Sequence, residues 1–206
     1  MTFDSSDDDL ISVPAIEKSL PPLPQQLREN LMSQHNLTQE VTIILVNEQK
    51  LLSYFKKVAA AKPSRSTKTI SNLLVNEFMS ICNKNKIDID SCKIAPDQIG
   101  ELVDMLESHY VNLNLSRMIL QDMIETLKSP KIIADENNWK QITDDAEIQK
   151  ICKEVLATES GKKMLKAYKL GKTKVLLAIA GEISRKTENK INMAKVMEIL
   201  KELVSK

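Results

Sequence analysis

Histidine and cysteine are the residues of this chain with the most versatile chemistry, and their spacing matches no familiar catalytic or metal site. His35 and His109 lie in unrelated segments, and no serine or aspartate around them completes a recognisable catalytic triad. Cys82, Cys92 and Cys152 contain no Cys-x-x-Cys pair, and neither histidine lies at zinc-ligand spacing from them. The chain also has no GxGxxG and no Walker A loop. The sequence therefore predicts no catalytic residue, no metal ligand and idle, reduced thiols.

The lysines and arginines near the C-terminus are the more informative charged residues. From Glu147 to Lys206 there are 14 of them against 7 carboxylates, a net +7, whereas Met1 to Ala146 has 15 against 21, a net −6. A basic end segment is typical of a surface that meets nucleic acid or anionic lipid, although a solvated lysine-rich helix gives the same count. The candidate phosphate contacts are Lys169, Lys172, Lys174, Arg185, Lys186 and Lys190.

These six candidates lack the aromatic neighbours that stack on unpaired bases. Tyr168 is alone among them and is expected in the core. Arg185 and Lys186 would also stabilise the C-terminus of a helix through its dipole. We therefore expect recognition of the phosphates or shape of folded RNA rather than of a single-stranded sequence.

Composition decides the fold class. Aromatic residues make up 3% of 206 residues, with 4 glycines and 7 prolines, so turn signals and strand formers are both scarce. An all-α protein is predicted. No apolar run approaches the roughly 20 residues that span a bilayer, so no membrane association is expected.

Residues 1–22 are predicted to be an extended lead-in. An acidic cluster, Asp7 to Asp9, is followed by prolines, and this composition favours a disordered tail over a cation site. The lead-in carries neither a basic nor an amphipathic leader pattern, so the chain as given is expected to have no secretory signal or transit peptide.

Apolar spacing predicts a helical bundle over residues 23–142. Helices are expected from Pro24 to a break at Asn36, where a left-handed residue can end the helix, and then at about 47–61, 69–82, from 96, and from 114 or 116. The bundle is expected to end near Pro130 and to be followed by a loop containing Trp139.

Residues 143–206 are predicted to form a separate domain of four short helices. Asp144 with Glu147 resembles a capping box at the start of the first helix. Residues 158–161 are expected to interrupt the helices, Gly171 to take a left-handed cap, and a long helix to run over about 172–186. The last helix is expected from about Asn192.

Several short motifs occur in the order found in one known family. In the tail they are Tyr168-Lys169-Leu170-Gly171-Lys172, Ala180-Gly181, and Arg185-Lys186-Thr187 with Asn192. Further forward they are Asp9-Leu10, the prolines at 21, 22 and 24, Leu37-Thr38, Tyr54-Phe55, and Ile94-Ala95-Pro96 with Leu102. Together they resemble the C-terminal half of the B subunit of tRNA-dependent amidotransferases, a helical domain followed by a YqeY-like tail.

This resemblance implies a function that composition alone does not. The family converts Glu-tRNA(Gln) or Asp-tRNA(Asn) to the amidated form, in a complex with A-type and C-type subunits. By resemblance, the tail contacts tRNA(Gln), with the six basic residues as the candidates for this contact, and the ATP and magnesium sites lie in an amino-terminal cradle domain that is expected to end just before Asp8. No cofactor is therefore expected in this chain, and catalysis by the chain alone is left open.

Four positions depart from the family pattern. Asn189 and Met193 stand where glycine and proline are usual, Asn36 replaces a glycine, and Leu73 follows Asn72 where tryptophan is frequent. Such divergence suits an organellar homologue, so a mitochondrial location is expected, with the bacterial cytoplasm as the alternative. A second functional interpretation is a helical interaction module that joins the other amidotransferase chains without binding tRNA.

Overall fold

The computed structural model describes residues 23–205, and in that range it is helical with a single isolated β-bridge. The all-α prediction is confirmed, while the predicted extended lead-in at 1–22 lies outside the described residues. The first group of helices comprises α2 (Pro24–His35), α3 (Gln39–Asn47), α4 (Gln49–Ala61), α5 (Thr67–Asn72), a π-helical turn η1 (Leu73–Phe78), α6 (Met79–Lys84), a 3₁₀ turn η2 (Ile89–Ser91), α7 (Pro96–Glu107), α8 (Leu113–Thr126) and α9 (Pro130–Glu136). The second comprises α10 (Asp145–Ala157), α11 (Glu159–Lys169), α12 (Val175–Lys186) and α13 (Met193–Ser205).

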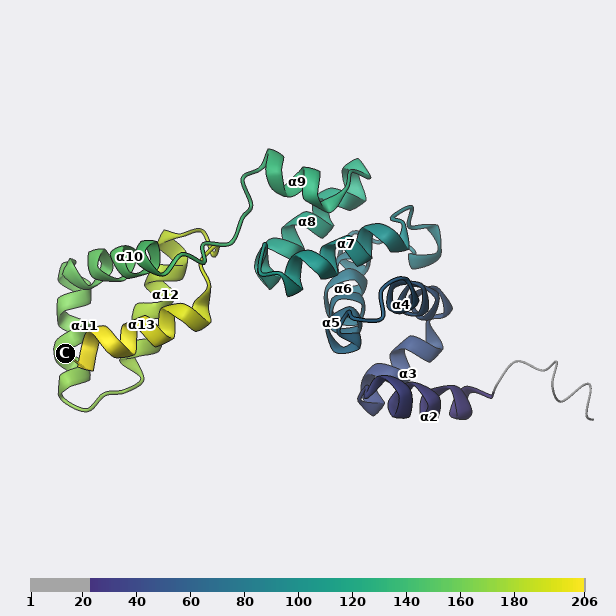
Figure 1. Cartoon of the computed structure of the whole chain (residues 1–206), viewed down its shortest axis with the longest axis horizontal. Coiled ribbons are helices and arrows are strands. Elements are labelled where there is room, and N and C mark those ends of the chain that lie inside the picture. The colour runs from purple at the N-terminus through teal and green to yellow at the C-terminus, as the bar shows by residue number, and fades with distance from the viewer. Residues whose placement is uncertain (1–22, 206) are drawn as a thin grey trace, which may run out of the picture.

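Figure 1 shows these as two separate groups of helices joined by an extended segment. Each group has its own hydrophobic cluster, one running from Leu31 to Ala134 and the other from Ile148 to Val204. The helices of the described range include none that is both long and apolar enough to cross a bilayer.

Aromatic rings lie at the centre of the first cluster. Tyr54 and Phe78 pack edge to face with ring centroids 5.7 Å apart, and both are almost completely buried. The ring of His35 makes a similar contact with Phe55 at 5.1 Å. His35 therefore packs as an aromatic side chain, which is a structural role.

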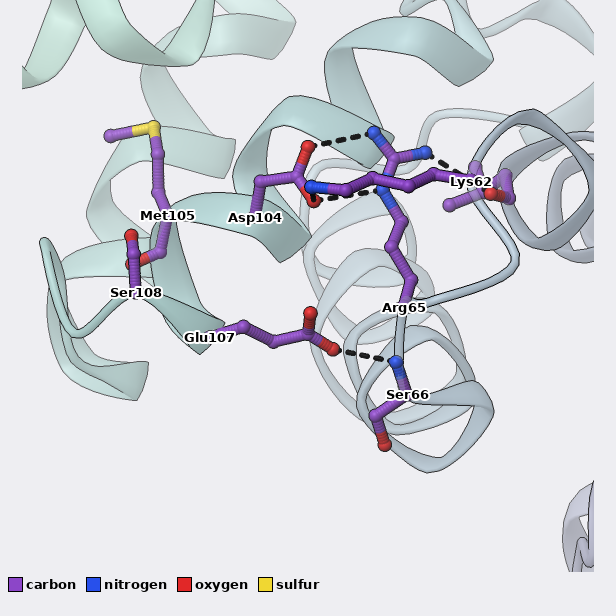
Figure 2. Close-up of polar contacts among 8 residues, drawn as sticks. Lys62, Arg65, Ser66, Asp104, Met105, Glu107 and Ser108 are labelled. Atoms are coloured by element: carbon purple, nitrogen blue, oxygen red, sulfur yellow. Dashed lines mark hydrogen bonds and ion pairs between the residues drawn. The ribbon is translucent and has the colours of Figure 1, made fainter.

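The largely buried guanidinium of Arg65 joins the α4–α5 connection to α7 (Figure 2). Arg65 donates to both carboxylate oxygens of Asp104, at 3.0 and 2.8 Å, and to the carbonyl of Val58 at 3.1 Å, while Lys62 adds an ion pair to Asp104 at 3.1 Å. The hydrogen bonds from Arg65 hold the pKa of Asp104 below its usual range. Gly100 of α7 lies under this group, because a Cβ there would be 2.7 Å from Nη1 of Arg65.

Several predicted helix boundaries are confirmed by the backbone. Asn36 ends α2 with a φ of 51°, and Gly171 takes a φ of 90° after α11. The carboxylate of Asp144 accepts a hydrogen bond from the N–H of Glu147 at 2.8 Å at the start of α10. Each residue type suits the conformation that its position requires.

Other expected boundaries are wrong. Pro130 does not end the first bundle but begins α9, because proline fits the first turn of a helix, where its missing N–H is not needed. The predicted interruption at 158–161 is confined to Thr158, which separates α10 from α11, whereas Gly161 lies inside α11 and donates its N–H to the side chain of Thr158 at 3.0 Å. The long helix α12 begins at Val175, after a turn, rather than at Lys172.

The corner between α10 and α11 explains the glycine at 161. A Cβ at this position would be 2.1 Å from the carbonyl oxygen of Val155 and 2.8 Å from the Cα of Leu156. Both are backbone atoms that cannot move aside without opening the corner. The close approach of α10 and α11 therefore requires glycine.

The segment between α9 and α10 is hydrogen-bonded to both groups of helices. The N–H of Gln141 donates to the carbonyl of Tyr110 at 2.9 Å, in the first group. One residue later, Ile142 donates to Lys190 at 2.8 Å and accepts from Asn192 at 3.1 Å, which forms the β-bridge to the α12–α13 connection. The contacts of the segment therefore change from the first group to the second between 141 and 142.

Candidate nucleic-acid interface

The six predicted phosphate contacts form two groups at opposite ends of α12. Lys169, Lys172 and Lys174, here called the loop lysines, lie at the end of α11 and in the connection to α12. Arg185, Lys186 and Lys190, here called the far-end cations, lie at the last turn of α12 and in the connection to α13. Since α12 has 12 residues at about 1.5 Å each, roughly 17 Å of helix separates the two groups. The structure therefore does not bring all six together in one patch.

The loop lysines are available for binding. All three are exposed, and within residues 23–205 none of them forms an ion pair or a side-chain hydrogen bond. They surround Gly171, whose Cα faces open space: apart from its own chain neighbours, no described residue has an atom within 4 Å of the position a Cβ would take. Beside them Leu170 is 82% exposed. This loop presents three positive charges that no described side chain neutralises, on an open turn.

Two of the far-end cations are already paired. Lys186 lies 2.6 Å from a carboxylate oxygen of Glu154, and Lys190 lies 2.8 Å from one of Glu188. Hydrogen bonding from these lysines lowers the pKa of both glutamates. A phosphate must compete with these carboxylates, so the far-end cations are poorer anion sites than the loop lysines. Arg185 remains exposed at the end of α12.

The pairing of Lys186 could not be predicted because Glu154 is 32 residues away in α10. The pairing of Lys190 with Glu188 is local, but it depends on the connection between α12 and α13. There Glu188 and Asn189 both take left-handed backbone conformations, with φ of 52° and 61°. Asparagine tolerates that conformation better than most residues, so Asn189 can occupy a position where glycine is usual.

A different face of the tail is acidic. Asp145, Glu198 and Glu202 line a shallow groove between α10 and α13. Lys195 in this groove is held by Asp145 at 2.7 Å and by the carbonyl of Thr143 at 2.8 Å. These carboxylates repel phosphate, so the charge distribution favours one orientation of the tail against an anionic partner.

The remaining candidate residues have structural positions. Tyr168 packs, partly buried, against the second hydrophobic cluster, as predicted. In the part of the chain that the structure describes, no three histidine, cysteine or acidic side chains lie close enough to hold a metal ion.

Two exposed leucines near the loop lysines were not predicted from the sequence. They are Leu170 and Leu177 of α12, and Leu177 is 66% exposed. Periodicity gives no signal for Leu170 because it lies outside the helices.

The fold and this surface together define an all-helical protein with a small basic C-terminal unit. The model of the GatB domain family matches residues 53–204, and the chain belongs to this family. The resemblance to amidotransferase B subunits is thereby confirmed.

Three similar proteins match this chain over more than 90% of its length. The chain is 40% identical over 192 residues to the B subunit of the mitochondrial glutamyl-tRNA(Gln) amidotransferase of Aedes aegypti, covering 92% of this chain and 36% of the relative. It is 33% identical over 201 residues to the corresponding mitochondrial protein of Drosophila melanogaster, covering 97% and 38%. It is 30% identical over 191 residues to the B subunit of the aspartyl/glutamyl-tRNA(Asn/Gln) amidotransferase of Caldanaerobacter subterraneus, covering 93% and 39%. The chain thus spans less than two fifths of the length of these relatives.

Proposed function

We propose that this chain acts as the C-terminal part of an amidotransferase B subunit that helps to form Gln-tRNA(Gln) from misacylated Glu-tRNA(Gln). Support comes from the GatB domain match and from relatives named as B subunits of glutamyl-tRNA(Gln) amidotransferases. The partners would be tRNA(Gln) and the A-type and C-type subunits. The same names support a mitochondrial location. ATP and magnesium would act in the amino-terminal cradle domain that the family resemblance implies.

The proposed division of labour follows the two hydrophobic clusters. Residues 23–142 would link the tail to the catalytic parts, and residues 143–206 would bind the tRNA body. The observation that carries the second role is that the loop lysines are exposed and have no ion-pair partner among residues 23–205. Each would contact a backbone phosphate, which gives affinity without reading bases.

A salt series with purified chain and tRNA(Gln) tests this role. Replacing the three loop lysines by alanine should lower the slope of log affinity against log salt by roughly two to three, at about 0.7–0.9 for each phosphate contact. A matched control removes three exposed lysines from the first group of helices: Lys56, Lys57 and Lys93. The control should bind like the unmodified chain.

A second triple variant removes the far-end cations. Because two of them are paired with glutamates, its effect on the salt slope should be smaller than that of the loop variant. Unchanged tRNA binding in both triple variants would refute the basic-tail interface. A larger decrease of the salt slope in the far-end variant than in the loop variant would place the interface at the other end of α12.

The exposed leucines support the second function, assembly without RNA binding. Leu170 and Leu177 present apolar surface near the loop lysines, at 82% and 66% exposure. If the tail is an interaction module, replacing both by serine should weaken association with the A-type and C-type subunits, and tRNA affinity should be absent at low salt. Salt-sensitive tRNA binding that survives these changes would exclude this alternative.

A further inference from the structure

A groove in the first group of helices contains the single tryptophan of the chain. It lies between η1 and α6 on one side and α8 on the other, and Trp139 from the connection between α9 and α10 adds to its wall. Its volume of about 590 Å³ lies within the roughly 300–1,000 Å³ of ligand pockets. This groove is here called the Trp139 groove, and its lining includes Glu77, Lys84, Arg117, Met118, Asp122 and Trp139.

One wall of the Trp139 groove holds an arginine in a fixed orientation. Arg117 donates from Nε and Nη2 to the two carboxylate oxygens of Glu77, the second bond at 2.8 Å. Glu77 lies in the π-helical turn η1 with only 6% of its side chain exposed, whereas 51% of the side chain of Arg117 is exposed. Two parallel hydrogen bonds of this kind fix the plane of the guanidinium. The groove therefore presents a flat cation whose counter-charge is buried beneath it.

Trp139 and Met118 give the same groove an apolar surface. Trp139 is half-buried against the first hydrophobic cluster, and Met118 of α8 is 42% exposed. The backbone of Trp139 is held by a hydrogen bond from its N–H to the carbonyl of Ala134 at 2.8 Å, after Asn138 turns the chain with a φ of 53°. Aromatic rings and guanidinium planes are the surfaces on which unpaired RNA bases stack, and this groove contains both.

The polar groups of the groove suit the rest of a nucleotide. Lys84, at the end of α6, is exposed, and its ammonium group forms no ion pair or hydrogen bond within residues 23–205. It is therefore free to contact a phosphate. The carboxylate of Glu77 is neutralised by Arg117, which leaves Asp122. Asp122 accepts from the amide of Asn137 at 3.4 Å and has further acceptor capacity for the amino group of a base.

We propose that the Trp139 groove binds one unpaired nucleotide of an RNA that is held by the tail. The base would stack against Trp139, with the guanidinium of Arg117 as a second flat surface, and Lys84 would contact the phosphate. The proposal rests on the proposed tRNA function, which brings RNA to the chain. It adds a base contact that the loop lysines lack, since they contact phosphates alone. Trp139 lies in the segment that leads to the tail (Figure 1), so the groove borders the proposed binding domain.

The fluorescence of Trp139 tests the proposal directly, because it is the single tryptophan of the chain. A base that stacks on the indole ring quenches its emission. We expect tRNA(Gln), titrated into the full chain, to quench this emission in step with the bound fraction measured by filter binding. Adenosine monophosphate is the comparison for a free nucleotide, and it should quench only at much higher concentration because it lacks the contacts to the loop lysines.

Three variants locate the nucleotide within the groove. Lys84→Ala should weaken the quenching and lower the salt slope of tRNA binding by about 0.7, whereas Lys93→Ala, an exposed lysine of the same group outside the groove, should change neither. Trp139→Leu keeps an apolar side chain but no ring, and should lower tRNA affinity by at least about fivefold in filter binding. Arg117→Lys keeps the charge opposite Glu77 without the flat face, and should weaken the quenching.

The outcomes separate this proposal from the tRNA function on which it rests. Binding of tRNA with unchanged Trp139 emission overturns the groove proposal and leaves the function of the tail intact. If tRNA does not bind, the proposed function fails, and a single-stranded oligoribonucleotide titrated alone then decides the groove: quenching supports it, and unchanged emission overturns it. Equal quenching in Lys84→Ala and Lys93→Ala, or quenching by adenosine monophosphate as strong as that by tRNA, also overturns the proposal.

Discussion

The first group of helices and the tail differ in the apolar side chains and ion pairs that stabilise them. Among the described residues, 27 apolar side chains are buried in the first cluster and 11 in the second. The first cluster contains large aromatic rings, and it also contains ion pairs with one nearly buried partner, such as Arg65 at 11% and Glu77 at 6% side-chain exposure. The tail has no buried aromatic residue in its described part, and its ion pairs are on the surface. The tail therefore presents charge to partners with only a small core beneath it.

The largest expected effect comes from the first cluster. Phe78→Ala should lower the free energy of unfolding of the first group by about 3–5 kcal/mol, because it removes a fully buried ring and its contact with Tyr54. Hydrogen exchange measured by mass spectrometry should show lost protection in α4–α8 and retained protection in α10–α13. Equal loss in both would mean that the two regions unfold as one unit.

A substitution at Gly161 should destabilise the tail and leave the first group of helices unchanged. Gly161→Ala places a methyl group against the backbone of Val155 and Leu156, so we expect a loss of about 1–3 kcal/mol confined to α10–α13. Gly181→Ala is the matched control, because this helical position has open space and should gain about 0.5–1 kcal/mol. Thermal unfolding of both variants, followed by exchange in the tail, measures the difference.

A third change removes the partly buried ion pair between Arg65 and Asp104 in the first group. Asp104→Asn loses the charged acceptor of Arg65, at a cost of about 1–2 kcal/mol at neutral pH. Since folding depresses the pKa of Asp104, its contribution is present above the ordinary carboxyl pKa near 4 and is lost as pH falls through the lower folded value. Chemical denaturation between pH 7 and pH 2 should therefore show a smaller acid-dependent loss in Asp104→Asn. An unchanged acid slope would contradict the role of this carboxylate.

The smallest expected effect concerns the exposed apolar residues of the tail. Leu170→Ser should change stability by no more than about 0.5 kcal/mol, because the side chain is 82% exposed and contributes little to the core. Ile179→Ser is the contrasting variant, since Ile179 of α12 is completely buried and its replacement should unfold the tail. A clear loss of stability in Leu170→Ser, seen in a melting curve, would show that this loop packs more closely than the structure has it.

Local chemistry made most of the fold predictable. The helices with regular apolar spacing, the left-handed ends at Asn36 and Gly171 and the cap at Asp144 follow from residue types within one turn of each other. The prediction at Pro130 was wrong because proline both ends and begins helices, and only packing decides which. The π-helical turn η1 has no local signal of this kind.

The candidate site could be predicted only in part, because it depends on contacts between residues far apart in the sequence. Charge counting located all six cations, and the GatB domain match supports the tail to which they belong. Charge counting could not distinguish the loop lysines from the far-end cations, because the pairing of Lys186 depends on how α10 packs against α12.

The connection between the two groups of helices has a consequence for affinity. Residues 137–144 are held on both sides, by Gln141 to the first group and by Ile142 to the second, and Asn112 adds a hydrogen bond to the carbonyl of Asn189 at 2.6 Å. Linking the two groups makes the second of two binding events intramolecular, and these hydrogen bonds limit the orientations that the tail can take. Once the first group is anchored in a larger assembly, the tail is therefore already positioned, and a partner that it binds only weakly in isolation can stay bound for longer.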